Sequence, residues 1–331
     1  MLFSIEPMTL SISDYHKLAS QGHAEAQNML GYCYLHGIEV KKNLSTAARL
    51  FWLSAKQRNA SGLNNLACCY ALGIGISKQL KESVHLFELA AKQQLLIAQN
   101  NLGYCYEHGQ GVGKNLTHAI RCYRMASKHQ FAEAEYNIGR CYEQGIGLWQ
   151  NILLAIHYYR AAAEQGHCKA QFRLAYCYEH TTESTQDLQK AFYYYQLAAQ
   201  QEYPKAQARL GHCYQYGIGT PHNFFEAARC YRHAAKKQIA EAQFRLAYCY
   251  EHGIGVEKNI LEAFHFYRLA ANQKFPAACE RFQRTPLTCS PKTQKDTRVH
   301  WKTNLWSSPP PPLAVSESPD ALSGVVRNTH T

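Results

Sequence analysis

Residues 242–259 read AQFRLAYCYEHGIGVEKN, and variants of this stretch recur along most of the chain. Each variant contains a Cys-Tyr pair. Seven such cysteines follow one another at a constant interval of 36 residues, at positions 33, 69, 105, 141, 177, 213 and 249. A Leu or Ile precedes every one of them by three residues. Seven gapless copies at one period predict a repeat protein over residues 24–275.

The first part of each copy has the spacing of a helix that ends at glycine. In the first copy, Ala26, Leu30 and Tyr34 fall on one side of a helix at about 100° per residue, with Cys33 at its margin. A glycine follows the cysteine by four residues in six copies, and glycine readily adopts the left-handed conformation that closes a helix. The fifth copy has Thr181 instead, so we expect its loop to differ in shape.

A second helix follows the glycine loop. Ten residues after the cysteine stands Asn in five copies, Asp187 in the fifth and Gln79 in the second, and Asn and Asp favour the helix N-cap. One helix pair cannot bury its apolar stripe alone, so neighbouring copies are expected to stack. The sequence therefore predicts an all-α solenoid of seven 36-residue helix-turn-helix repeats.

The flanks differ from the repeats. Residues 13–23 align with the end of a second helix and are expected to form an N-terminal capping helix, preceded by a flexible N-terminus over residues 1–12. Residues 276–282 begin an eighth first helix before the pattern stops, which predicts a partial repeat that caps the array. Residues 283–331 are rich in Pro, Ser and Thr, so we expect a disordered tail.

The pattern of the copies, A-x-x-x-L-G-x-C-Y-x-x-G-x-G-V-x-K-N followed by A-x-x-x-Y-R-x-A-A, resembles the Sel-1-like repeat family. The seventh copy carries it at Ala242, Leu246, Ala247, Tyr250, Gly253, Gly255, Val256, Asn259, Ala263, Tyr267, Ala270 and Ala271. The resemblance implies a right-handed superhelix of helical hairpins, related to tetratricopeptide arrays. It also implies a non-catalytic adaptor or scaffold that binds other proteins. The alternative is a dedicated regulatory subunit of one enzyme, as in the chitin-synthase activators that share these repeats.

The composition argues against other classes of function. The net charge is +11, but Lys and Arg are interleaved with Glu, so we expect acidic protein partners and no nucleic acid. No uninterrupted apolar run approaches the length of a membrane span, so no membrane insertion is expected. The start of the chain lacks the features of a secretory signal, so we expect a cytoplasmic location. No catalytic residue set stands out, which argues against an enzyme.

The 13 cysteines are interpreted as free thiols. The repeating cysteines occupy equivalent points of adjacent repeats, too far apart for disulfides, which favours a reducing compartment. Cys105 and His108 stand at i and i+3, and three other copies repeat this pair. One helix then offers two ligands where zinc needs three or four, so we expect neither a metal nor a cofactor.

The face of each first helix opposite Ala26 and Leu30 is the candidate binding surface, because in related arrays it lines the concave groove. Aromatic and Arg side chains are enriched at binding hot spots. Arg pairs bidentately with carboxylates, so the later copies suit an acidic peptide. The early copies carry Asn, and the resemblance to tetratricopeptide superhelices implies that an asparagine row holds an extended peptide backbone. The alternative is a solvated surface that is aromatic by chance. The candidates are Asn65, Asn101, Tyr104, Tyr136, Asn137, Arg140, Phe172, Arg173, Tyr176, Arg209, His212, Phe244, Arg245 and Tyr248.

The tail carries a second candidate motif. Pro309, Pro310, Pro311 and Pro312 favour polyproline II, which proline-reading domains recognise. Trp301 and Trp306 lie just upstream and are candidates for a short anchor motif. The alternative for this segment is a plain spacer.

Overall fold

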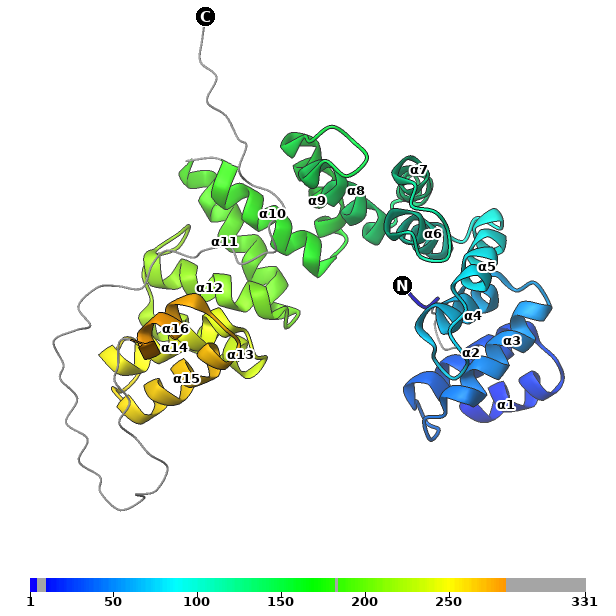
Figure 1. Ribbon diagram of the computed structural model, residues 1–331, viewed down its shortest axis with the longest axis horizontal. Helices are drawn as coiled ribbons and strands as arrows, with labels where there is room; N and C mark the ends of the chain where they lie inside the picture. The colour runs from blue at the N-terminus through cyan, green and yellow to red at the C-terminus, as the bar shows by residue number, and fades with distance from the viewer. Residues whose placement is uncertain (5–9, 182–183, 284–331) are drawn as a thin grey trace, which may run out of the picture. The chain divides into compact units, whose positions relative to one another are not determined.

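The computed structural model describes residues 1–4, 10–181 and 184–283, and over these residues it is all-helical (Figure 1). Sixteen helices occur there and no strand, which confirms the predicted fold class. Helix α1 (Ile12–Ser20) precedes seven helical hairpins and α16 (Pro276–Gln283) follows them. The hairpins are α2–α3 (Ala24–His36, Leu44–Lys56), α4–α5 (Ala60–Leu72, Leu80–Lys92), α6–α7 (Leu96–His108, Leu116–Ser127), α8–α9 (Ala132–Gln144, Ile152–Glu164), α10–α11 (Cys168–Thr181, Thr185–Gln200), α12–α13 (Pro204–Tyr216, Phe224–Lys236) and α14–α15 (Ala240–His252, Ile260–Asn272).

The chain forms two compact units. The first, residues 1–167, contains α1–α9, and the described part of the second, residues 168–283, contains α10–α16. Within the first unit, α1 packs on α2 through Tyr15 and Ala19. Within the second, Ala278 of α16 packs into a cluster with Phe244 and Tyr267. The predicted partition into caps, repeats and tail stays a prediction, and the tail residues Trp301, Trp306 and Pro309–Pro312 lie outside the described residues.

Caps define the hairpins as predicted. Six first helices end at a left-handed glycine whose N–H donates to the carbonyl of the repeating cysteine, as at Gly37 (φ 76°) and Cys33. The asparagines Asn43, Asn115, Asn151, Asn223 and Asn259 accept a hydrogen bond from the backbone of the helix that they begin. Gln79 makes no such side-chain bond. These caps confirm the helix boundaries expected in those copies.

The second loop glycine allows neighbouring repeats to approach. A Cβ added to Gly75 would collide with the carbonyl oxygen of Leu44, at the start of the second helix of the preceding repeat. Gly255 lies in the same way against Phe224. Both glycines have positive φ, so a side chain here would be strained as well as obstructed. The glycine pattern therefore encodes contacts between repeats in addition to the turn.

The fifth repeat departs from this plan. Its first helix continues to Thr181, and its second helix begins at Thr185 with Ser184 as N-cap, three residues before the place of the asparagine in other copies. The prediction of Asp187 as N-cap is therefore wrong, because Asp187 lies within the first turn of α11. The expected difference at this loop is confirmed for its described flanks.

The core contains alanines, the repeating cysteines, the Leu or Ile three residues before them, and an aromatic ring from each second helix. Phe51, Phe87, Tyr123, Tyr159, Tyr195, Tyr231 and Tyr267 are the buried rings of the second helices. Cys33 is fully buried rather than marginal, because α2 packs against α1 and α4 as well as against its own partner helix α3. The twelve described cysteines are free, as expected, and burial raises the pKa of the Cys69 thiol to about 12. No described helix is both long and apolar enough to cross a membrane.

Candidate functional site

The first helices of the first unit are joined by side-chain amides. Asn65 Nδ2 donates to Asn28 Oδ1 at 2.9 Å. One repeat further, Asn101 Nδ2 donates to Asn64 Oδ1 at 3.0 Å. The next repeat has the same bond at 2.9 Å, from Asn137 to Asn100. These six residues form what we call the asparagine ladder, and each is buried. A ladder amide keeps hydrogen-bonding capacity after this contact, because it has two N–H donors and an oxygen with two lone pairs.

The remaining capacity is used by a peptide backbone, that of residues 1–4. Asn101 Oδ1 accepts from Leu2 N at 2.9 Å while Asn101 Nδ2 donates to Leu2 O at 2.8 Å. Asn65 does the same to Ser4, accepting from its N at 2.6 Å and donating to its O at 3.0 Å. Asn64 Nδ2 also donates to Leu2 O, at 3.1 Å. Each of two alternate residues is thus held by both of its backbone groups.

This arrangement resembles strand pairing without a second strand. In an extended chain, alternate residues present their N–H and C=O groups to the same side. The ladder supplies one amide with a two-bond contact per repeat to such a chain, Asn65 of α4 to Ser4 and Asn101 of α6 to Leu2, and Asn64 of α4 adds a single bond to Leu2. Since these bonds read only the main chain, they accept any residue that has an N–H, which excludes proline.

Side-chain contacts add limited selectivity. The Phe3 ring lies 6.2 Å from that of Phe51, and Met1 and Phe3 pack against the apolar core of the early repeats. Ser4 is buried, and its hydroxyl lies 3.1 Å from that of Ser61. Residues 1–4 belong to the segment over residues 1–12 that was expected to be flexible, and that expectation stays a prediction. Bonds from distant side chains to an extended backbone leave no periodicity in the sequence, so the pattern did not reveal this contact.

The predicted Arg140 is engaged within the first unit. Its Nη2 donates to Glu107 Oε2 at 2.6 Å, and the Tyr123 hydroxyl donates to the same oxygen at 2.8 Å. Burial raises the pKa of Glu107, but the bond and charge of Arg140 together with the Tyr123 hydroxyl outweigh it, so the pKa is lowered. Arg140 thus compensates a buried carboxylate, and a partner's acidic group would have to compete with Glu107 for it.

The predicted tyrosines lie against other rings. Tyr104 stacks on His108 with ring centroids 4.0 Å apart, and Tyr248 stacks on His252 at 4.1 Å. In the first unit, the ring of Tyr136 packs against that of the buried Tyr159. These stacks are compatible with a partner surface and do not by themselves specify a ligand.

In the second unit, predicted residues gather around a carboxylate. Arg209 Nη1 lies 3.8 Å from Glu179 Oε1, and the Tyr195 hydroxyl donates to Glu179 Oε2 at 2.6 Å. The guanidinium groups of Arg209 and Arg173 each lie 5.4 Å from the ring centre of Tyr176. The structure therefore brings these arginines together, with Arg209 close to a carboxylate of its own chain.

The other candidates of the second unit are also engaged. Arg245 Nη1 donates to the Tyr216 hydroxyl at 3.1 Å. The rings of Phe172 and Phe244 pack against Tyr195 and Tyr267, so they belong to the interior and not to an exposed surface. Burial, followed by the charges of Arg245, Arg209 and His180, lowers the pKa of His212 to about 3, so its imidazole is neutral.

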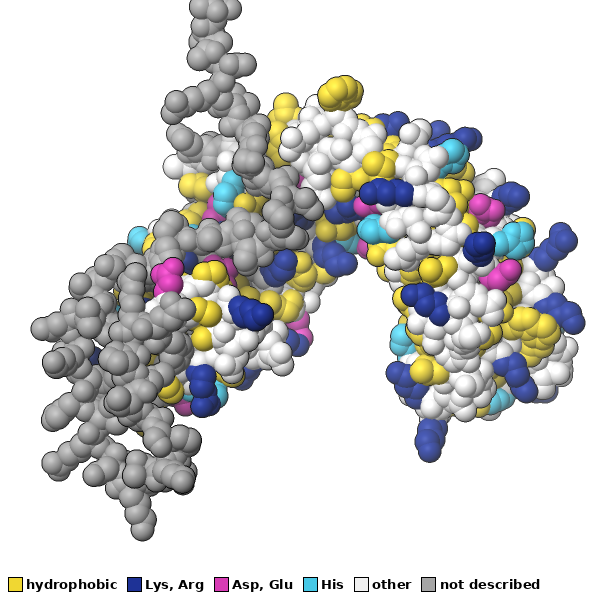
Figure 2. Space-filling model, viewed as in Figure 1, with side chains coloured by type: hydrophobic (Ala, Val, Ile, Leu, Met, Phe, Trp, Pro, Cys, Tyr) yellow, Lys and Arg dark blue, Asp and Glu magenta, His cyan; other side chains and the backbone are white. Residues whose placement is uncertain are grey.

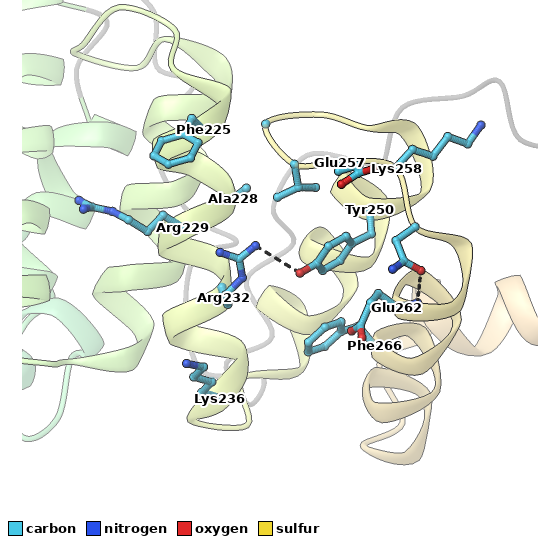
Figure 3. A pocket seen from close by; sticks show the side chains of 13 residues that line it. Phe225, Ala228, Arg229, Arg232, Lys236, Tyr250, Glu257, Lys258, Glu262 and Phe266 are labelled. Carbon is cyan, nitrogen blue, oxygen red and sulfur yellow. Dashed lines mark hydrogen bonds between the residues drawn. The ribbon is translucent and has the colours of Figure 1, made fainter.

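A cavity of about 740 Å³ lies in the second unit between α13 and the loop and helix that follow Tyr250 (Figure 3). Arg229, Arg232 and Lys236 line it from α13, and Arg232 Nη2 donates to the Tyr250 hydroxyl at 3.2 Å. This cavity was not predicted from the sequence, although the three cations that line it stand at helical spacing. On the face of the molecule in Figure 2, by contrast, Lys and Arg side chains of the first unit are scattered between other types, without one basic patch.

Comparisons with known proteins agree with the repeat fold. A model of the Sel1 repeat matches residues 24–59, 60–95, 96–131, 132–167, 168–203, 204–238 and 240–275. A solved protective antigen of uropathogenic Escherichia coli with an SLR fold is 27% identical, with a TM-score of 0.69, over 82% of this chain and 58% of its own. This chain thus spans less than two thirds of that antigen. A Sel1 repeat protein from Oxalobacter formigenes is 29% identical, with a TM-score of 0.62, over 72% of this chain and 96% of its own. The sequence matches no curated protein significantly.

Proposed function

The chain belongs to the Sel1 repeat family, and we propose that it is a non-catalytic adaptor that binds extended peptide segments of partner proteins on its asparagine ladder. The observation that carries this proposal is the pair of two-bond contacts from Asn65 and Asn101 to the backbone of Ser4 and Leu2. In each contact the peptide residue donates its N–H to the amide oxygen and accepts one amide N–H, while the second amide N–H stays bonded to another ladder asparagine.

The chemistry of the ladder favours a peptide over other ligands. Its groups are neutral amides that match the N–H and C=O groups of a main chain in number and polarity. Nucleic acid would require cations to neutralise phosphates, and the ladder contributes none. Main-chain recognition is also tolerant of sequence, which suits an adaptor with several partners better than a regulatory subunit with a single one.

The finer parts of the proposal concern the second unit and the surroundings. We propose that acidic segments meet Arg209 and Arg173 there, in competition with Glu179, and that the buried free thiols belong to a reducing, cytoplasmic environment. The proline motif of residues 309–312 remains a separate candidate for a proline-reading domain.

The test is a selection of binding peptides from a random library on the purified chain, followed by affinity measurements on variants. We expect Asn65→Ala/Asn101→Ala to bind the selected peptides about 1,000-fold more weakly, because each of the two amides loses two hydrogen bonds of about 1 kcal/mol each. Asn272→Ala, which removes an exposed amide at the end of α15, is the matched control. Thermal unfolding checks that the double variant is folded. Equal affinity of wild type and double variant would refute the ladder as the site.

A further inference from the structure

We propose that residues 1–4 act as an intramolecular competitor for the asparagine ladder, so that a partner peptide binds by displacing them. This inference rests on the proposed function and adds two statements to it. The first is that the site is self-occupied. The second is that its ligand is an extended peptide that uses two residues per repeat, runs against the order of the repeats and carries an apolar residue between two clamped ones.

While residues 1–4 are bound, neither Asn65 nor Asn101 has an N–H left for a second peptide. Both N–H groups of Asn101 are used, one by Leu2 O and one by Asn64 Oδ1. Both N–H groups of Asn65 are used in the same way, by Ser4 O and Asn28 Oδ1. A partner backbone therefore cannot add to this arrangement and has to replace it.

The direction and register of the ligand follow from the same bonds. Leu2 is held by α6 and Ser4 by the preceding repeat's α4, so the residue number falls as the repeat number rises. A longer peptide in this register would reach Asn137 on α8 with the residue two before the one equivalent to Leu2. At the opposite end, Asn28 Nδ2 is buried without a hydrogen-bond partner among the described residues. A longer ligand can therefore make contacts that residues 1–4 do not make.

The residue between the two clamps is read by its side chain. Phe3 points its ring toward Phe51 and packs on the core of the early repeats, while its backbone N–H makes no bond to the ladder among those described. Ser4 fits a buried place beside Ser61. We expect displacing peptides to carry an aromatic or large aliphatic residue in the place of Phe3, followed by a small residue.

The experiment releases the segment without touching the ladder. Leu2→Pro and Ser4→Pro each remove an N–H that donates to Asn101 or Asn65, because proline has none. Leu10→Pro, at an exposed position outside the segment, is the matched control. The probe is an acetylated synthetic peptide of residues 1–10 with a fluorophore at its carboxyl end, and its affinity for the full chain is measured by fluorescence anisotropy.

We expect the probe to bind the Leu2→Pro/Ser4→Pro variant about 10-fold or more tightly than wild type, since a site that is nine-tenths self-occupied loses a factor of 10 in apparent affinity. The Leu10→Pro variant should behave as wild type. Adding Asn65→Ala/Asn101→Ala to the released variant should abolish probe binding. Hydrogen exchange provides a direct readout, because the Leu2 and Ser4 amides should be protected in wild type and should exchange freely in Asn65→Ala/Asn101→Ala, which keeps both amides but lacks their acceptors.

Three results overturn the inference. Equal affinity of the probe for wild type and released variant would mean that residues 1–4 do not compete. Probe binding that survives loss of Asn65 and Asn101 would place the segment elsewhere. A wild-type dimer that dissociates in the released variant would mean that the segment docks on a second copy. In each case, library peptides that still depend on Asn65 and Asn101 would leave the proposed function standing, which separates the two failures.

Discussion

The two units place different chemistry at the same position of their first helices. In α4, α6 and α8 of the first unit the position holds asparagine, whereas in α10, α12 and α14 of the second it holds arginine. The amides bond to one another and to a peptide backbone, while Arg209 lies beside Glu179. The repeat thus fixes where a side chain lies and leaves open what it binds.

The difference follows from the cost of burying charge. A buried guanidinium needs a nearby carboxylate, whereas a buried amide needs only hydrogen-bond partners. The residue 30 positions before Arg209 is Glu179, and the residue 30 positions before Asn101 is Ala71. The same relation joins Arg281 to Glu251, at 2.8 Å, and Asn65 to Leu35. At Arg209 and Arg281 the preceding repeat therefore supplies a carboxylate, whereas Asn137 has Glu107 at this separation and Arg245 has Gln215, so the match is not general.

Of the predicted changes, removal of the Glu179 carboxylate in the second unit should lower the free energy of unfolding most. Glu179→Ala leaves the buried Arg209 without its carboxylate and the Tyr195 hydroxyl without its acceptor. We expect the free energy of unfolding to fall by about 3 kcal/mol, as for other buried pairs that lose one partner. Chemical denaturation followed by circular dichroism measures it.

The neighbouring repeat supplies the control. There Gln215 Oε1 accepts from the Tyr231 hydroxyl at 2.7 Å, so the same hydroxyl contact exists with a neutral acceptor. Gln215→Ala should cost only about 1 to 2 kcal/mol, because it removes a hydrogen bond and no charge. If both alanine variants cost the same, the stability of the second unit does not depend on charge matching at Arg209.

The comparison is tested further by replacing Asn101 of the asparagine ladder with arginine, the residue that the second unit has at this position of the repeat. Asn101→Arg should lower the free energy of unfolding by about 2 kcal/mol, because it removes the bonds to Asn64 and Leu2 and adds a charge that faces Ala71 instead of a carboxylate. Adding Ala71→Glu should recover about half of the loss. Asn101→Leu loses the same bonds without gaining charge, so equal stability of the Arg and Leu variants would argue against a role for the missing carboxylate. Thermal and chemical unfolding of the four proteins gives the answer.

Most of the fold could be predicted from the sequence because it is encoded locally and repeated. The glycine at Gly37 and the cap at Asn43 act within a few residues of themselves, and the copies repeat the signal until it is unmistakable. The predicted N-cap was wrong where a second residue nearby could take the same position. In the fifth repeat, Ser184 is the N-cap residue three positions before Asp187, although its side chain makes no capping hydrogen bond, and a single sequence does not show which of two residues with good capping propensity takes this position.

The site was predictable in part. The row Asn65, Asn101 and Asn137 was identified from the sequence. The asparagines that accept their hydrogen bonds, Asn28, Asn64 and Asn100, were not, although Asn64 and Asn100 directly precede members of the row. The contact of residues 1–4 with Asn101 joins segments 99 positions apart and depends on backbone groups that every residue carries. The pairing of Arg209 with Glu179 left a visible signal, an acid and a base 30 positions apart, which only the packing of one first helix on the preceding repeat makes meaningful.

Protonation of His212 is expected to have the smallest effect. It tests whether Arg209 and Arg245, rather than Glu179, dominate the electrostatic potential around His212 in the second unit. Glu179 Oε1, 4.0 Å from His212 Nδ1, favours the charged imidazole, but burial and the charges of Arg245, Arg209 and His180 oppose it and lower the pKa to about 3. Because the folded-state pKa lies below the unfolded value of 6.5, the unfolded chain binds more protons between these values, and stability falls as the pH falls. Between pH 6.5 and 5.5 we expect a loss of about 1 kcal/mol, measured by urea denaturation, that is absent in His212→Gln. A loss of the same size in His212→Gln would assign the titration to another group. If the stability of the wild-type protein does not change over this range, the effect of Glu179 on the pKa of His212 outweighs that of the arginines. The electrostatic potential at this part of the second unit would then be negative rather than positive, which disfavours an acidic peptide.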